Sequence, residues 1–341
     1  MNTEPYINLS SQLEVPDDEA DRNLALELVR VTEAAAIAGG HWIGFRDKNH
    51  ADGAAVDAMR SMLSSVRFNG VVVIGEGEKD EAPMLFNGEK VGDGSGPVCD
   101  VAVDPIDGTR LTANGMNNAL AVLAVAEENS MYDASEVFYM EKLIVGEDAA
   151  GVIDITLPAK INLNLIAKAK NKKLNQLTVC VLDRPRHEDL IKEINAAGAR
   201  VCLISDGDVA GGIAAARPNT GIDVLMGIGG SPEGVVTACA LKALGGAIQG
   251  RLWVDNEEDK KRALDAGHDL DKVLHTNDLV KGDNCYFAAT GITNGDLLRG
   301  VKYEGDKLFT HSIVMRSKSK TVRFVEAEHQ AAKWASYERK L

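Results

Sequence analysis

The alternation of short apolar segments with amphipathic ones after about residue 177 is the feature that most constrains the fold. It predicts strands at 179–182, 201–204 and 222–226, and helices at 188–197, 208–216 and 232–244. Such alternation indicates a mostly parallel sheet covered by helices. Ligand-binding groups are then expected in the loops at the carboxyl ends of the strands, which are 183–187, 205–208 and 227–233.

The first half of the chain shows a different pattern. Helical spacing predicts helices at 19–38 and 53–66, with Asp52 at the N-cap of the second, unless that acid has a functional role. Strands are expected at 71–74, 98–103, 118–126, 142–145 and 152–156, and further strand-like stretches at 284–325. We therefore predict an α+β and α/β protein, with a mixed-sheet N-terminal part and an alternating strand/helix C-terminal part.

The length of 341 residues suggests two domains, at roughly 150 residues each. We place an α+β domain at 1–170 and an α/β domain at 171–341, with the stretch 168–176 as the connection. Within this division, the C-terminal strands could still pack against the first domain.

Charge and composition argue against several classes of protein. Lys and Arg number 37 against 51 Asp and Glu, a net charge of −14, so binding to nucleic acid is not expected. The apolar runs are too short to span a membrane, and the polar N-terminal stretch does not resemble a secretory signal. We expect a cytoplasmic protein whose five scattered cysteines are reduced thiols in the core.

The strongest chemical signal is the apolar segment at 100–103 followed by Asp104-Pro105-Ile106-Asp107-Gly108-Thr109. Proline ends strand pairing, so both acids can share one loop. Two carboxylates held so close repel each other unless a proton or a cation lies between them. Gly108 and Thr109 offer donors for a phosphate or a water. A plain solvated turn is the alternative interpretation.

Three further acids follow strands or begin helices. Glu76 lies in the acidic loop 75–81, Asp52 precedes a helix, and Glu233 lies in a helical first turn. Each has an ordinary explanation as a solvated or capping acid. Together they favour a site for a hard cation such as Mg²⁺ or Mn²⁺, because oxygen ligands suit these ions better than zinc or copper.

A basic loop, Asp183-Arg184-Pro185-Arg186-His187, concentrates positive charge in an acidic chain. Guanidinium groups match phosphate oxygens in geometry and charge. The alternative is a loop of solvated arginines at the start of a helix.

These residues resemble a known family. The motif at 104–109 is similar to that of the lithium-sensitive, metal-dependent phosphatases, which include inositol monophosphatases. The segments 47–55, 73–78, 139–146 and 227–236 resemble class II fructose-1,6-bisphosphatases, most closely the cyanobacterial enzymes that also hydrolyse sedoheptulose 1,7-bisphosphate. The resemblance extends from about residue 23 to 324. It implies the layered sugar-phosphatase fold and hydrolysis of a sugar 1-phosphate in gluconeogenesis and the Calvin cycle.

The resemblance also implies roles for matching residues. The metal ligands would be Asp52, Glu76, Asp104, Asp107 and Glu233, and the catalytic residues Thr109, Asp52 and Glu76. The substrate contacts would be Lys48, Asp107, Gly108, Thr109, Tyr139, Arg184, Pro185, Arg186, Asp206, Gly207, Asp208 and Gly230. The metal would be Mn²⁺ or Mg²⁺, the assembly a homotetramer and AMP an inhibitor.

Three alternatives remain open from the sequence. An inositol-phosphate phosphatase would not need the second arginine-rich loop. A sugar-phosphate sensor could use the same fold without catalysis. A glycoside hydrolase also needs paired carboxylates, but sugar clefts usually carry more aromatic residues than the 5% present here.

Overall fold

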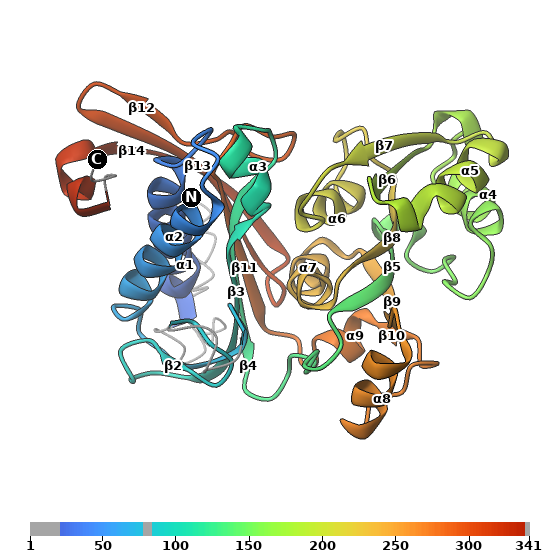
Figure 1. Cartoon of the computed structure of the whole chain (residues 1–341), viewed down its shortest axis with the longest axis horizontal. Coiled ribbons are helices and arrows are strands. Elements are labelled where there is room, and N and C mark those ends of the chain that lie inside the picture. Colours follow the sequence, from blue (N-terminus) through green and yellow to red (C-terminus); the bar gives the residue numbers. More distant parts are fainter. Residues whose placement is uncertain (1–20, 78–83, 338–341) are drawn as a thin grey trace, which may run out of the picture.

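Two sheets and three helical layers make up the computed structural model of the chain, which describes residues 21–77 and 84–337 (Figure 1). The described α-helices are α1 (Asp21–Gly40), α2 (Lys48–Leu63), α3 (Thr109–Asn114), α4 (Ala159–Ala169), α5 (Glu188–Ala197), α6 (Val209–Ala216), α7 (Ser231–Leu244), α8 (Glu257–Asp265) and α9 (Thr276–Leu279).

The first sheet has eight strands among the described residues. Its order is β12-β13-β11-β4-β3-β1-β2, and β14 pairs with β13. The strands are β1 (Asn69–Ile74), β2 (Lys90–Val91), β3 (Val98–Asp107), β4 (Leu120–Glu127), β11 (Cys285–Gly291), β12 (Lys302–Glu304), β13 (Lys307–Arg316) and β14 (Thr321–Gln330). Strands from both ends of the chain therefore build one sheet.

The second sheet has six strands in the described part of the chain, in the order β10-β9-β5-β8-β6-β7. They are β5 (Tyr139–Val145), β6 (Thr178–Leu182), β7 (Arg200–Ile204), β8 (Val224–Gly230), β9 (Ala247–Trp253) and β10 (Leu274–His275). β6 runs parallel to β7 and β8, whereas β5 runs antiparallel to β8 and β9. This sheet is mixed, so the expectation of a mostly parallel sheet was wrong.

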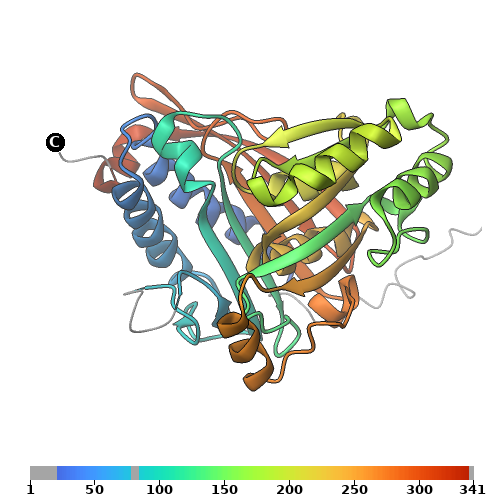
Figure 2. The same cartoon turned by 45° about the vertical axis from the view of Figure 1, so that its right-hand side comes forward.

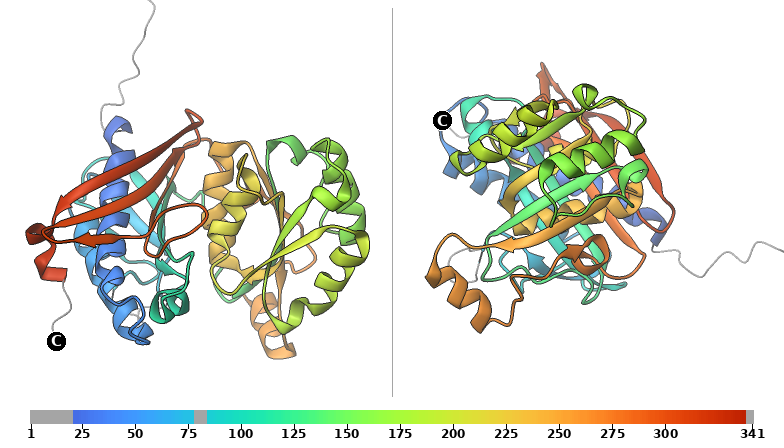
Figure 3. Two further views of the ribbon diagram at one scale, coloured as in Figure 1. Left: turned by 90° about the horizontal axis from the view of Figure 1, so that it is seen from above. Right: turned by 90° about the vertical axis from the view of Figure 1, so that its right-hand side faces the viewer.

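Helices separate and cover the sheets, giving an α-β-α-β-α stack (Figures 2 and 3). α1 and α2 cover the outer face of the first sheet, α6 and α7 lie between the sheets, and α4 and α5 cover the far face of the second. The central strands β3, β4 and β11 of the first sheet are buried on both faces. In β4, Leu123 and Val125 face α1 and α2, while Val122 and Ala124 face α7. The predicted fold class is confirmed.

Three local predictions were wrong. Residues 152–156 form turns instead of a strand, because side chains satisfy their backbone: Gln249 bonds the N–H of Ile155 and the carbonyl of Ile153. α2 begins at Lys48, because Asp47 and not Asp52 accepts the N–H of His50 at 3.1 Å. The expected loop at 227–233 is largely strand and helix, since β8 pairs with β5 as far as Gly230.

The chain crosses between the sheets twice. It passes from the first sheet to the second between β4 and β5, and returns between α9 and β11. The stretch 168–176 lies on the second sheet side, where Leu174 packs with the α4 core. The proposed boundary at residue 170 stays a prediction. Within the described ranges, none of the helices combines the length and hydrophobicity needed to cross a bilayer.

Candidate active site

The end of β3 carries the acidic motif into a cavity. The antiparallel pairing of β3 with β4 is irregular between Asp104 and Asp107, where Pro105 lacks a backbone donor. Gly108 then adopts a φ of 93°, and Thr109 begins α3. Asp107 is only 3% exposed. Both acids therefore lie in the buried end of β3, and only Gly108 forms the turn into α3. The expectation of an acidic loop directly after residue 103 was wrong, because β3 pairs with β4 again at Asp107 and Leu120, beyond the irregularity.

The cavity has a volume of about 380 Å³ and collects acids from across the sequence. Asp52 comes from α2, Glu76 follows β1, and Glu233 lies in the first turn of α7. All three line the cavity together with Asp104 and Asp107. Residues 78–81 of the acidic loop lie outside the described residues. The convergence expected of these five acids is thus present, while their roles stay predictions.

Mutual repulsion and burial disfavour ionisation of these acids. Burial, together with the charge of Asp52, raises the pKa of Glu76 to about 7. Burial and neighbouring carboxylates raise the pKa of Asp104 and Asp107 well above the usual range. The pKa values of Asp52 and Glu233 are also raised, mainly by burial. An electrostatic field of this kind attracts cations.

Two buried oxygen atoms at this site lack a hydrogen-bond partner. They are Oδ2 of Asp107 and Oε2 of Glu233. A buried carboxylate oxygen without a donor is costly, and a cation would remove that cost. The lining contains no histidine or cysteine, so the donor set fits a hard cation. Among the described residues, no group of three or more His, Cys, Asp or Glu side chains lies as close together as the ligands of a bound metal do.

A second group of residues lies at the ends of β6 and β7. Arg184 Nη2 contacts Oδ1 of Asp206 at 2.9 Å, and Arg110 Nε lies 3.4 Å from Oδ2 of the same carboxylate. Arg186 Nη2 donates to the carbonyl of Ile228 at 2.8 Å, whereas its buried Nε has no partner. Asp206 lines the cavity, so the two groups are continuous.

The structure divides the expected substrate residues into two sets. Gly108, Thr109, Asp206 and Gly207 line the cavity with the acids. The remaining ones lie outside that lining: Lys48, Tyr139, Arg184, Pro185, Arg186, Asp208 and Gly230. Of these, Lys48 is exposed at the start of α2.

Sequence reasoning gave no role to three residues at this site. Arg110 shares Asp206 with Arg184, Phe138 lines the cavity although it is 69% exposed, and Lys142 forms a buried ion pair with Asp208. For Lys142 the available signal was its place at the start of the strand expected at 142–145, because a charged residue in a buried strand needs a partner; the charged neighbour Glu141 made that signal weak.

Comparison with known proteins assigns the family. Residues 22–329 match the profile described as bacterial fructose-1,6-bisphosphatase, glpX-encoded. The chain belongs to this family. It is 50% identical over 321 residues to "Fructose-1,6-bisphosphatase 1 class 2" of Escherichia coli K12, covering 90% of this chain and 95% of the relative. The "Fructose-1,6-bisphosphatase class 2" of Shigella flexneri has the same identity and coverage.

The resemblance to class II fructose-1,6-bisphosphatases is therefore confirmed, as is the prediction of a phosphoric monoester hydrolase. The closer likeness to the cyanobacterial dual enzymes stays a prediction.

Proposed function

We propose that this chain hydrolyses the 1-phosphate ester of fructose 1,6-bisphosphate with the help of divalent cations, Mn²⁺ or Mg²⁺. The observation that carries the proposal is the cavity lined by Asp52, Glu76, Asp104, Asp107 and Glu233. Family membership supports the substrate, since the relatives are named fructose-1,6-bisphosphatases.

The five acids would hold the cations. The unpartnered oxygens of Asp107 and Glu233 supply free acceptors on opposite elements, β3 and α7. A bound divalent cation supplies charge neutralisation for the phosphoryl oxygens and activation of water. Burial and neighbouring carboxylates raise the pKa values of Asp104 and Asp107, and a bound cation would favour the charged forms of both acids.

Thr109 and Asp52 would orient the attacking water, with Glu76 beside them. The Thr109 hydroxyl lies 3.3 Å from the carbonyl of Ile106, to which it donates. Its oxygen keeps lone pairs for the proton of a water, and all three side chains line the same cavity. The expected reaction is an in-line displacement of the sugar oxygen by water.

The distal phosphate would bind at Arg184 and Arg186. The Nε of Arg186 is a buried donor without a partner, and its guanidinium lies 4.8 Å from the ring centre of Tyr139. Guanidinium groups held in place by other contacts recognise phosphate with little loss of conformational entropy. Binding at this end orients the reacting phosphate.

Polar groups between the two ends would contact the sugar. They are Asp206 and Asp208, after β7. Lys48 would be an additional phosphate contact, and Pro185, Gly207 and Gly230 would be further substrate contacts, as the family resemblance implies. Carboxylates here would accept hydrogen bonds from sugar hydroxyls.

We also propose sedoheptulose 1,7-bisphosphate as a second substrate, with a role in the Calvin cycle beside gluconeogenesis. The resemblance to cyanobacterial dual enzymes supports it, as it supports a homotetramer and inhibition by AMP. The cytoplasmic location stays an expectation from the sequence. Measurement of the molecular mass in solution tests the homotetramer, and the activity in the presence of added AMP tests the inhibition.

The decisive experiment is a phosphate-release panel. Fructose 1,6-bisphosphate, sedoheptulose 1,7-bisphosphate and inositol 1-phosphate are each supplied with and without Mn²⁺. We expect Mn²⁺-dependent release from the two bisphosphates. Release from inositol 1-phosphate alone would support the inositol-phosphatase alternative, and binding without release would support a sensor.

A further inference from the structure

Lys142 is a buried lysine in the middle of β5, only 2% exposed. Its Nζ lies 2.5 Å from Oδ2 of Asp208 and donates to the carbonyl of Gly230 at 2.9 Å. A buried ammonium needs such partners, because its desolvation is otherwise uncompensated. One charged side chain of β5 thus contacts two segments, the loop that ends at Asp208 and the end of β8 at Gly230.

Glycines make room for this ion pair. A Cβ added to Gly229 would lie 1.9 Å from Oδ2 of Asp208 and 2.9 Å from Nζ of Lys142. A Cβ added to Gly234 would lie 3.6 Å from Cδ of Lys142. Any larger residue at position 229 would therefore displace the carboxylate from the lysine.

The two partners of Lys142 belong to two different segments of the chain that contribute to the proposed site. Asp208 ends the loop whose residues Asp206 and Gly207 line the cavity. Gly230 is the N-cap of α7, and a Cβ on it would lie 1.7 Å from Oε2 of Glu233. The carboxylate of Glu233 therefore rests against the residue whose carbonyl Lys142 binds.

We propose that Lys142 is a positioning residue that fixes the loop at 206–208 relative to the first turn of α7. It thereby fixes the positions of Asp206 and Gly207 relative to Glu233, all three of which line the cavity. This inference rests on the proposed function of the same cavity. Lys142 lines no part of the cavity itself, so it acts through Asp208 and Gly230.

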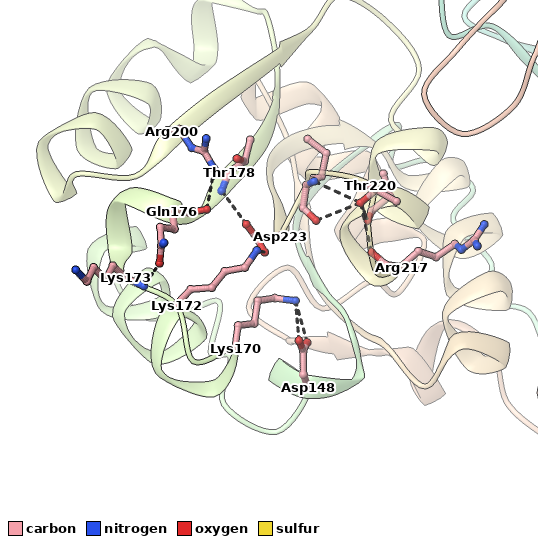
Figure 4. Close-up of polar contacts among 12 residues, drawn as sticks. Asp148, Lys170, Lys172, Lys173, Gln176, Thr178, Arg200, Arg217, Thr220 and Asp223 are labelled. Atoms are coloured by element: carbon pink, nitrogen blue, oxygen red, sulfur yellow. Dashed lines mark hydrogen bonds and ion pairs between the residues drawn. The ribbon is translucent and has the colours of Figure 1, made fainter.

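Lys142→Met tests the proposal, because methionine keeps much of the length and loses the charge. Lys172→Met is the matched control (Figure 4). Lys172 Nζ also lies 2.5 Å from a buried aspartate, Asp223, at the opposite end of the same sheet. Both variants remove the lysine partner of an aspartate that is 4–5% exposed. Asp208 follows directly on Asp206 and Gly207 of the cavity lining, whereas Asp223 adjoins no lining residue.

Two readouts are measured for each variant: the KM for fructose 1,6-bisphosphate and the Mn²⁺ concentration that gives half of the maximal rise in Tm. For Lys142→Met we expect both to rise about 10- to 100-fold, the usual effect of losing a group that orients metal ligands. Lys172→Met is expected to lower Tm and to leave both readouts unchanged.

The direction of the Mn²⁺ effect separates position from charge. Removing a positive charge alone would strengthen cation binding by neighbouring carboxylates. A weaker Mn²⁺ response in Lys142→Met therefore supports positioning, and an unchanged or stronger response overturns it.

Gly229→Ala provides a second variant if Lys142→Met does not fold. It keeps every charge but places a methyl group where Oδ2 of Asp208 lies, so we expect the same two shifts. Wild-type readouts in this variant would overturn the proposal. If wild type itself released no phosphate, the proposed function would fail, whereas the Mn²⁺ response would still test the positioning role.

Discussion

The guanidinium group of Arg186 stacks over the ring of Tyr139, with Cζ 4.8 Å from the ring centre. The arginine comes from the loop after β6, and the tyrosine begins β5. Nη2 of Arg186 also donates to the carbonyl of Ile228 on β8. Three strands of the second sheet thus hold one guanidinium in place, while its buried Nε stays without a partner.

Arg186→Ala is expected to remove most of the selectivity for bisphosphates. Loss of a charge-assisted contact with the distal phosphate should raise KM for fructose 1,6-bisphosphate about 10- to 100-fold. Fructose 1-phosphate, which lacks that phosphate, should be affected little. Steady-state kinetics on both substrates check this.

Arg200→Ala is the control for this substitution. Arg200 begins β7 and donates to the carbonyl of Gln176, at the end of the strand away from Asp206. Equal KM values in Arg186→Ala and Arg200→Ala would remove the assignment of Arg186.

Metal removal is expected to abolish phosphate release and to lower stability. Without a cation the acids keep raised pKa values, because burial and, after it, neighbouring carboxylates disfavour their charged forms. Saturating Mn²⁺ should raise Tm by about 5 °C after EDTA treatment. Glu233→Gln should show a much smaller rise, and scanning fluorimetry measures both. A full rise in Glu233→Gln would argue against Glu233 as a ligand.

Gly230→Ala is expected to weaken cation binding without unfolding the protein. The φ of Gly230 is −68°, which suits alanine, but the new Cβ would overlap the carboxylate of Glu233. We expect the half-saturating Mn²⁺ concentration to rise about 10- to 100-fold. In Gly151→Ala the new Cβ meets nothing within 4 Å, so this variant should behave as wild type in the same titration.

His187 makes part of the stability depend on pH. Its Nε2 accepts the N–H of Ile228 at 2.7 Å, so Nδ1 carries the proton and donates to the carbonyl of Leu182, also at 2.7 Å. Burial lowers the pKa of His187 below the usual 6.5. The folded state therefore favours the neutral ring, and its contribution is complete above pH 6.5 and lost as pH falls through the lowered pKa.

His187→Ala tests this pH dependence. The two hydrogen bonds are worth about 2 kcal/mol together, and the difference in unfolding free energy from wild type should shrink in acid. A difference in His187→Ala that stays constant from pH 7.5 to 5 would contradict the expectation.

Local patterns in the sequence predicted the parts of the fold that local physics determines. The helix at 188–197 matches α5, and the acidic motif at 104–109 does turn into a cavity. The spacing of apolar residues was sufficient to predict the helix, and the proline and glycine of the motif were sufficient to predict the change of direction. The strand predicted at 152–156 is absent, because the backbone of this stretch of β-branched residues forms hydrogen bonds with the side chain of Gln249 instead of with a neighbouring strand.

Long-range pairing was beyond local patterns. No local signal placed β5 between β8 and β9 or made the second sheet mixed. For the same reason the sequence did not predict the buried ion pair behind the cavity. Lys142 and Asp208 are far apart in the sequence, and only the pairing of β5 with β8 brings them together.

The return of β11 to the first sheet determines when the molecule can fold during its synthesis. β4 pairs with β3 on one side and with residues 285–291 on the other, so its second edge stays bare until most of the chain has been translated. β3, which carries Asp104, therefore belongs to an unfinished layer for most of translation. Chaperone capture of the nascent polypeptide should accordingly persist until β11 leaves the ribosome.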